Sequence, residues 1–238
     1  MKNINSPLKI RNSTFKNRFI VPPMASQTAS HEGFVTDETL KHYQRLGQAQ
    51  ASLLIVEYTY VHSGGRSESN QTAIDRDDKI EGLTRLVDLI RSSGSLAGVQ
   101  LTHACGKSSH DLAGGGMIGP SDVSVPVKGE TLEKPRAMRP QEIQEMKKWF
   151  VDAARRAVRA GFDLIEIHAA HGYGINQFLS PITNHRTDLY GKDRALLLVQ
   201  IVQEIREEFS DLLISVRMPG QDFIEGGLSI EDTIQIAK

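Results

Sequence analysis

The sequence has little of what marks a secreted, membrane-bound or nucleic-acid-binding protein. Its 238 residues contain a single cysteine, Cys105, so no disulfide can form within the chain, as is typical of a reducing cytoplasm. The 28 Lys and Arg nearly balance the 29 Asp and Glu, which leaves no basic excess for nucleic acid and no acidic tail. Residues 1–19 lack the apolar core of a signal peptide, and the most apolar run, 52–61, is too short to cross a bilayer. We therefore expect a soluble cytoplasmic protein.

Short apolar runs alternate along the chain with longer segments of helical periodicity. The runs predict strands at 18–24, 52–61, 96–103, 162–170 and 212–219. The periodic segments predict helices at 37–51, 78–92, 140–160, 193–209 and from Ser229 onward. Because the strands are apolar along most of their length, they fit parallel strands that are covered on both faces. We expect one α/β domain over residues 1–238, either a doubly wound sheet or a (β/α)₈ TIM barrel.

An irregular excursion at 104–139, between the third strand and the third helix, is rich in Gly, Ser and Pro. Within it, "GGGMIG" at 114–119 satisfies the spacing G-x-G-x-x-G of dinucleotide-binding proteins. A polar stretch precedes this match and Pro120 follows it, whereas the motif requires a strand before it and a helix after it. We interpret the stretch as a loop over the mouth of the barrel.

Polar side chains gather where each predicted strand ends. They are Ser26 beyond Met24 and Ala25 on the first strand, Tyr58 on the second, Gln100 and His103 on the third, His168 and His171 on the fourth, and Arg217 on the fifth. In a barrel the carboxyl ends of all strands meet at one mouth, where barrel active sites lie. In an open sheet the same groups would spread along an edge, so the pattern favours the barrel.

The stretch "IEIHAAHGYGINQFLSP" at 165–181 places His168, His171 and Tyr173 within six residues. Three interpretations are open for the histidines: hydrogen-bonded structural groups, a zinc site, or a pair that holds a substrate oxygen. Zinc would need a third ligand such as His103 or Asp163. Neutral imidazoles can instead stabilise negative charge on a carbonyl oxygen, while Tyr173 supplies a proton.

Two further polar residues lie in apolar runs. Arg217 follows "LLISV", where a cation is costly unless a carboxylate or an anionic ligand accompanies it. Gln100 is either a structural amide or a group that binds the edge of a planar heterocycle. Each residue alone favours a structural role, but together at one mouth they favour a site for a flat polar cofactor and a carbonyl substrate.

Four segments now show a likeness to a known family: "NRFIVPPM" at 17–24, "GVQLTHACGK" at 98–107, "IHAAHGYGINQFLSPITNHRTDLYG" at 167–191, and "VRMP" with "DFIEGGLSIED" near 216–232. With these segments in the same order, the chain resembles the Old Yellow Enzyme family of FMN-dependent NAD(P)H:flavin oxidoreductases. The resemblance implies a (β/α)₈ barrel with FMN at its mouth, where NAD(P)H reduces the flavin. The flavin then reduces the activated C=C bond of an α,β-unsaturated carbonyl compound.

The resemblance also implies roles for individual residues. His168 and His171 would bind the substrate carbonyl and Tyr173 would be the proton donor. The cofactor would be bound by Pro23, Met24, Ala25, Tyr58, Gln100 and Arg217. No metal site is implied, and the partner would be a small electrophilic alkene rather than nucleic acid or membrane. The physiological substrate, the choice of NADH or NADPH and the oligomeric state, a homo-oligomer included, stay open.

The chain departs from the family pattern in three respects. Ala25 stands where relatives often have Cys or Thr, and Tyr58 where many have a small residue beside the flavin. About five of eight βα units are visible, so we expect an incomplete barrel without the units that normally supply the phosphate site. The alternative function is therefore a non-catalytic barrel fragment that needs a partner chain or the missing segment. A zinc-dependent barrel hydrolase is a more distant third interpretation.

Overall fold

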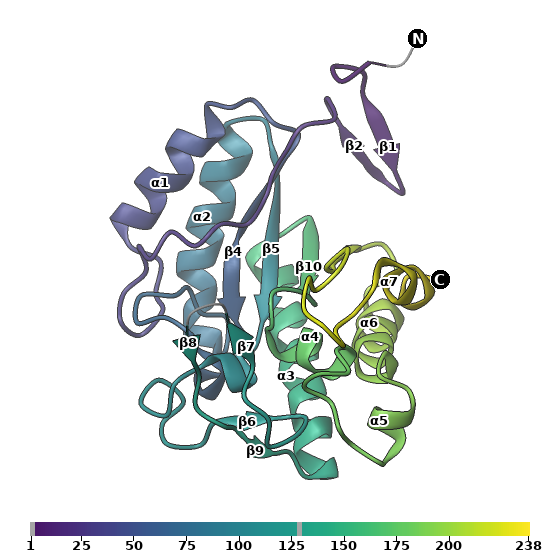
Figure 1. The fold of residues 1–238 in the computed structure, drawn as a ribbon. Coiled ribbons are helices and arrows are strands. Elements are labelled where there is room, and N and C mark those ends of the chain that lie inside the picture. The colour runs from purple at the N-terminus through teal and green to yellow at the C-terminus, as the bar shows by residue number, and fades with distance from the viewer. Residues whose placement is uncertain (1–2, 128–129) are drawn as a thin grey trace.

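The computed structural model describes residues 3–127 and 130–238 (Figure 1). Its strands are β1 Leu8–Ile10, β2 Ser13–Phe15, β3 Ile20–Val21, β4 Leu53–Tyr60, β5 Leu96–Thr102, β6 Ile118–Gly119, β7 Pro126–Val127, β8 Glu130–Thr131, β9 Arg136–Ala137, β10 Leu164–His168 and β11 Leu213–Arg217. Its α-helices are α1 Asp37–Gly47, α2 Ile80–Ser92, α3 Pro140–Ala160, α4 Gly174–Leu179, α5 Leu189–Lys192, α6 Leu196–Glu208 and α7 Ile230–Ile236. Short 3₁₀ turns occupy Ser63–Gly65, Asp77–Lys79 and Cys105–Lys107.

The main sheet is parallel, with the strand order β11-β10-β5-β4-β3. This order follows the chain without reversal. A doubly wound sheet reverses its strand order at a switch point, whereas a barrel adds each strand beside the last. The sheet is therefore part of a (β/α)₈ barrel, with β3 and β11 at its two edges, and the prediction of an incomplete barrel is confirmed.

Helices cover the outer face of the sheet in the order of the strands. Helix α1 contacts α2, α2 contacts α3, and α3 contacts α6 (Figure 1). The ends of these helices follow from the sequence: the Thr36 side chain caps the first turn of α1, and Gly161 ends α3 in the left-handed conformation at φ 93°. The buried residues of the helices pack with the outward-facing residues of the strands into the larger hydrophobic core.

A hairpin that the periodicity does not predict, β1 and β2, lies at the amino end of the sheet (Figure 1). Its strands have three residues each, too few to show an alternation, and its turn includes Arg11 at φ 51°. Phe15 from β2 packs with Leu53, Leu164 and Leu213 on the inner face of the sheet. The hairpin thus covers the end of the sheet opposite the predicted mouth.

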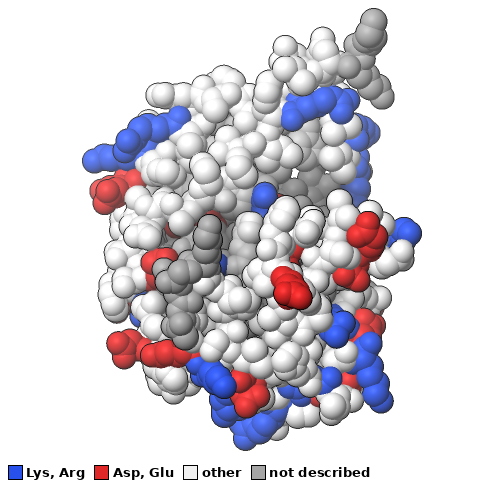
Figure 2. Space-filling model, viewed as in Figure 1, with Lys and Arg blue, Asp and Glu red and all other residues white. Residues whose placement is uncertain are grey.

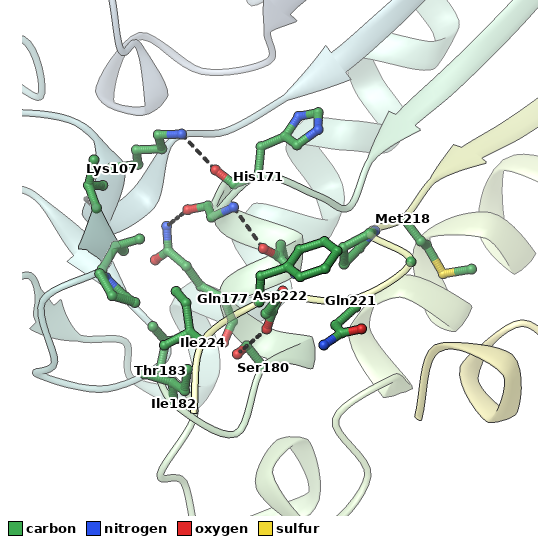
Figure 3. A pocket seen from close by; sticks show the side chains of 18 residues that line it. Lys107, His171, Gln177, Ser180, Ile182, Thr183, Met218, Gln221, Asp222 and Ile224 are labelled. Atoms are coloured by element: carbon green, nitrogen blue, oxygen red, sulfur yellow. Dashed lines mark hydrogen bonds between the residues drawn. The ribbon is translucent and has the colours of Figure 1, made fainter. Parts of the chain in front are cut away.

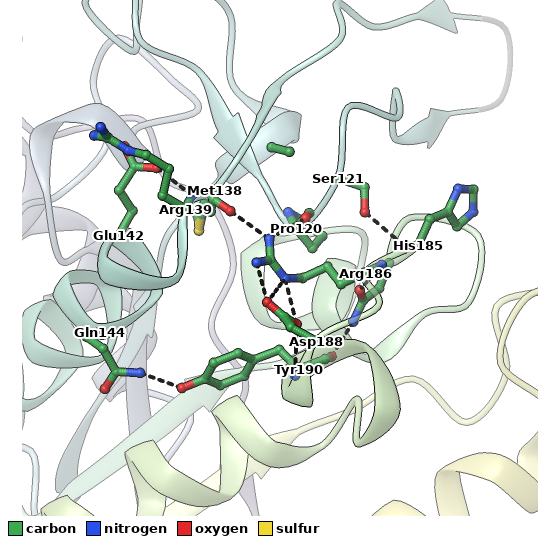
Figure 4. Close-up of polar contacts among 12 residues, drawn as sticks. Pro120, Ser121, Met138, Arg139, Glu142, Gln144, His185, Arg186, Asp188 and Tyr190 are labelled. Carbon is green, nitrogen blue, oxygen red and sulfur yellow. Dashed lines mark hydrogen bonds and ion pairs between the residues drawn. The ribbon is translucent and has the colours of Figure 1, made fainter.

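Arg186 fastens the excursion to the barrel (Figure 4). Its Nη1 donates to the carbonyl oxygens of Pro120, at 2.9 Å, and Met138, at 2.7 Å, while Asp188 binds the other side of the guanidinium. The "GGGMIG" stretch ends in β6, which pairs with β9, and irregular backbone follows. It therefore lacks the helix of a dinucleotide-binding motif, as the sequence indicated.

The molecular surface carries both signs of charge. On the face in Figure 2, Lys and Arg lie beside Asp and Glu, and most of the surface belongs to neither kind. Within residues 3–127 and 130–238, no helix is both long enough and apolar enough to cross a membrane.

Candidate functional site

The carboxyl ends of the main strands surround a cavity of about 360 Å³. Its lining comprises Pro23, Ala25, Tyr58, Glu68, Gln100, Lys107, His168, His171, Tyr173 and Arg217. Of the nine site residues that the sequence predicts, all but Met24 line this one cavity. Met24 is 54% exposed and does not line the cavity, so its role in binding the cofactor stays a prediction. Glu68 and Lys107 line the cavity as well, although neither was among the predicted site residues.

A tight turn after β10 brings the three groups of "HAAHGY" together. His171 and Gly172 both have left-handed backbone, at φ 60° and φ 75°, and the chain reverses there before α4 begins. As a result the centroid of the His168 ring lies 4.6 Å from that of Tyr173 and 5.2 Å from that of His171. Lys107 holds the turn, because its Nζ donates to the His171 carbonyl at 2.6 Å.

Both histidines are neutral near pH 7. Burial, the neighbouring His171 and the cations Lys107 and Arg217 lower the pKa of His168 to about 3. Burial and the same two cations also lower the pKa of His171. The backbone N–H of Ala170 donates to Nδ1 of His168 at 3.4 Å, which assigns the imidazole proton to Nε2. A neutral imidazole with this tautomer can donate a hydrogen bond to a carbonyl oxygen.

Gln100, Glu166 and Arg217 form a polar triad on three adjacent strands. One oxygen of Glu166 accepts from Gln100 Nε2 at 2.8 Å and from Arg217 Nε at 2.7 Å. Parallel register explains this contact, since Glu166 lies opposite Gln100 in β5 and opposite Ser215 in β11. The carboxylate that the Arg217 position requires is therefore Glu166, which the sequence reasoning missed. Its only signal was a charged residue inside the apolar run "DLIEIH".

A second buried carboxylate, Glu57 on β4, fixes the loop after β3. It is 1% exposed, and it accepts from the backbone N–H of Ser26 and from the Thr72 hydroxyl, the latter at 2.6 Å. Because Ser26 follows Ala25 directly, Glu57 sets where the backbone of Ala25 lines the cavity.

A larger cavity, of about 610 Å³, adjoins the mouth (Figure 3). It shares Lys107 and His171 with the mouth cavity and extends between α4 and the loop after β11. The far wall contains both polar and apolar groups. The Ser180 hydroxyl donates to the Asp222 carboxylate at 3.0 Å, and the exposed ring of Phe223 lies nearby. This cavity leaves open space beside the histidine pair.

His103 lies outside both cavities, although the sequence placed it among the groups at the mouth. It is fully buried beside Trp149, with ring centroids 5.3 Å apart, and Gly65 packs directly on it. Among residues 3–127 and 130–238, no three His, Cys, Asp or Glu side chains are grouped so that they could hold a metal ion. His103 and Asp163 therefore do not join His168 and His171 in a metal site within this part of the chain.

We expect the free energy of unfolding to fall as the pH drops below about 6.5. Burial, aided by His62, lowers the pKa of His103 to about 3, and the pKa of His168 is similarly low. Between about pH 3 and 6.5 each of these histidines binds a proton in the unfolded chain but not in the folded chain. The free energy of unfolding therefore falls by up to about 1.4 kcal/mol per pH unit for each histidine. Urea unfolding at pH 7 and pH 5 measures this loss.

A His168→Asn variant should lose part of this pH dependence, whereas His185→Asn, which changes an exposed histidine, should keep all of it. The carboxyl group of Glu142 does not disturb the comparison of pH 5 with pH 7. Arg136 and Arg139 hold its pKa well below the usual range, so it affects stability only below about pH 4.5. Equal stability at pH 5 and pH 7 would show that the two buried histidines accept protons in the folded state.

Comparison with protein families matches residues 3–238 to the NADH:flavin oxidoreductase / NADH oxidase family. The chain is 39% identical over 237 residues to an NADPH dehydrogenase of Geobacillus sp. (strain WCH70), covering 98% of this chain and 68% of the relative. It is 37% identical over 238 residues to the NADPH dehydrogenase of Bacillus subtilis (strain 168), again covering 98% of this chain and 68% of the relative. The chain thus spans about two thirds of the length of these relatives.

Solved structures show the same fold. The chain superposes on a 2-naphthoyl-CoA reductase complexed with 2-naphthoyl-CoA with a TM-score of 0.93 at 28% identity, covering 99% of this chain and 38% of that one. It superposes on an Old Yellow Enzyme from Pichia sp. AKU4542 with a TM-score of 0.89 at 26% identity, covering 99% of this chain and 65% of that one.

Proposed function

The chain belongs to the NADH:flavin oxidoreductase / NADH oxidase family, an FMN- and NAD(P)H-dependent family of oxidoreductases, and on this premise we propose that it acts as an ene-reductase. Its substrate would be an α,β-unsaturated carbonyl compound, whose C=C bond is reduced at the expense of NAD(P)H. One observation carries the proposal: His168, His171 and Tyr173 lie side by side in the cavity that Gln100 and Arg217 also line.

The lining of the cavity fits the ring system of FMN. A planar heterocycle with a polar edge needs hydrogen-bonding groups on one side and small or apolar groups against its face. Gln100 and Arg217 supply the polar groups, and the Glu166 carboxylate fixes both of them. Pro23 and Ala25 supply a small apolar wall. These residues would hold FMN, which when bound relays hydride from NAD(P)H to the substrate.

In this proposal the histidines and Tyr173 have different roles. His168 and His171 bind the carbonyl oxygen as neutral donors and stabilise the charge that develops on it during reduction. Tyr173 gives its phenolic proton to the carbon next to the carbonyl group. Because both histidines are neutral, they hold the oxygen without protonating it, and the proton comes from Tyr173.

An anaerobic absorption titration tests the proposal. FMN added to the purified 238-residue chain should show the shifted spectrum of a bound flavin, and NADPH should then bleach it. Gln100→Leu should weaken FMN binding, whereas Gln48→Leu, at an exposed position at the end of α1, should not. A protein that never binds FMN would contradict the proposal and would favour the alternative of a non-catalytic barrel fragment.

A further inference from the structure

Two residues that carry hydroxyl groups, Ser67 and Tyr58, lie beside Tyr173. The Ser67 Oγ, from the loop after β4, lies 3.5 Å from the Tyr173 hydroxyl. The ring of Tyr58, at the carboxyl end of β4, meets the Tyr173 ring edge-on with centroids 5.5 Å apart. Burial raises the pKa of both phenols, and the Ser67 hydroxyl acts in the opposite direction on each of them. The proposed roles of His168, His171 and Tyr173 do not use the Ser67 hydroxyl, so its position beside Tyr173 calls for another explanation.

A buried amide fixes the two hydroxyl-bearing residues to each other. Gln71 is 1% exposed, and its Oε1 accepts from the backbone N–H of Ser67 at 2.9 Å and from the Ser67 hydroxyl at 3.3 Å. The Nε2 of the same amide donates to the Tyr58 carbonyl at 2.9 Å. The loop therefore carries Ser67 at a set place above β4, rather than as a free surface serine.

The Ser67 hydroxyl has one proton and two acceptors within reach. While Tyr173 is neutral, its O–H can donate to Ser67 Oγ, and Ser67 donates to Gln71. Once Tyr173 has lost its proton, the phenolate is the stronger acceptor, because hydrogen bonds to charged groups are the stronger ones. A rotation of the Ser67 hydroxyl then satisfies the phenolate without any movement of the backbone.

We propose that Ser67 and Tyr58 are positioning residues that bind the phenolate of Tyr173 after it has protonated the substrate. The inference rests on the proposed ene-reductase function. In that step the O–H bond of Tyr173 breaks and a C–H bond forms at the carbon next to the carbonyl, while the adjacent carbon receives the hydride. The electron pair stays on the phenolic oxygen, where the hydroxyls of Ser67 and Tyr58 donate to it.

The charges around Tyr173 explain why such donors matter. Burial raises the pKa of Tyr173, Glu68 raises it further, and the hydroxyls of Ser67 and Tyr58 oppose both effects. Lys107 Nζ lies 4.6 Å from the ring centroid, and His168 and His171 are neutral neighbours. Without the two hydroxyl groups, the phenolate would form in a largely buried site close to the Glu68 carboxylate.

Titration of the tyrosines tests the inference without any cofactor or substrate. The chain has five tyrosines, so ¹³Cζ labelling gives few NMR signals to assign, and Tyr173→Phe identifies the one of interest. Ser67→Ala and Tyr58→Phe should each move the midpoint of Tyr173 upward by about one pH unit, as expected from losing one hydrogen bond to a charged group. Ser67→Thr keeps the hydroxyl and should leave the midpoint in place. So should Tyr60→Phe, since Tyr60 lies on the same strand but donates to Glu32.

Rapid kinetics of substrate reduction complete the test. Ser67→Ala should slow this step about tenfold and shift its pH profile, but it should add no slowing once Tyr173 is already Phe. If Tyr173→Phe slows substrate reduction while Ser67→Ala changes neither the titration nor the rate, the inference is wrong and the proposed function stands. If Tyr173→Phe has no effect on substrate reduction, the proton-donor role in the proposed function is wrong instead.

Discussion

Replacing Tyr173 with Phe should slow reduction of the unsaturated substrate by about a hundredfold to ten-thousandfold, the usual contribution of a positioned general acid. Reduction of the bound flavin by NADPH should keep its rate, because that half-reaction transfers a hydride and needs no proton from Tyr173. The substitution removes one oxygen from a ring that is held between His168 and Tyr58, so the packing of the site should survive.

Anaerobic stopped-flow measurements separate the two half-reactions. Tyr190→Phe is a matched control, since it also removes a buried phenolic hydroxyl, one that binds Gln144 and Gln200 and lines neither of the two cavities (Figure 4). That variant should leave both rates unchanged apart from a small loss of stability. An equal fall of both half-reactions in Tyr173→Phe would mean that the residue supports the site as a whole and is not the proton donor.

The sequence predicted the strands of the main sheet to within a few residues, and the reason is physical. Parallel strands covered on both faces must be apolar along most of their length, so they appear as continuous runs such as "LLIV" in β4. The predicted helix at 37–51 overran α1 by four residues, but the start of α1 and the end of α3 were accessible, because Thr36 and Gly161 act through their own local conformation. The hairpin β1–β2 was not, since its strands are held by contacts with the distant inner face of the sheet.

The candidate site was likewise only partly predictable from the sequence. Residues at strand ends could be grouped from the sequence, because the carboxyl ends of barrel strands share one mouth. The partnership of Glu166 with Gln100 and Arg217 depends on the register of three strands, and nothing in a single sequence fixes that register. Ser67 could not be found either, since a buried amide brings its loop to Tyr173 from more than a hundred residues away along the chain.

Replacing both His168 and His171 with Ala should weaken the binding of a phenolic or carbonyl ligand by at least about a hundredfold. Each neutral imidazole is expected to donate one hydrogen bond to the ligand oxygen, and a hydrogen bond to a charged oxygen contributes about 1.5–3 kcal/mol. His168→Ala should have the larger effect of the two single variants, because His168 is 4% exposed whereas His171 is exposed. A spectral titration of the FMN-loaded protein with a phenol measures the affinity.

The pH dependence of this titration shows whether the phenol or the histidines change their protonation state. Burial keeps His168 neutral down to about pH 3, and burial with the two nearby cations lowers the pKa of His171 below its ordinary value, so neither histidine gains or loses charge between pH 7 and 9. The affinity for the phenol should therefore rise only where the phenol itself ionises, since its oxyanion is the better acceptor for two neutral donors. His185→Ala, which changes an exposed histidine away from the cavity, should bind the ligand normally. Unchanged affinity in the double variant would mean that the oxygen is held elsewhere, and an affinity that rises below pH 6 would mean that an imidazolium binds it.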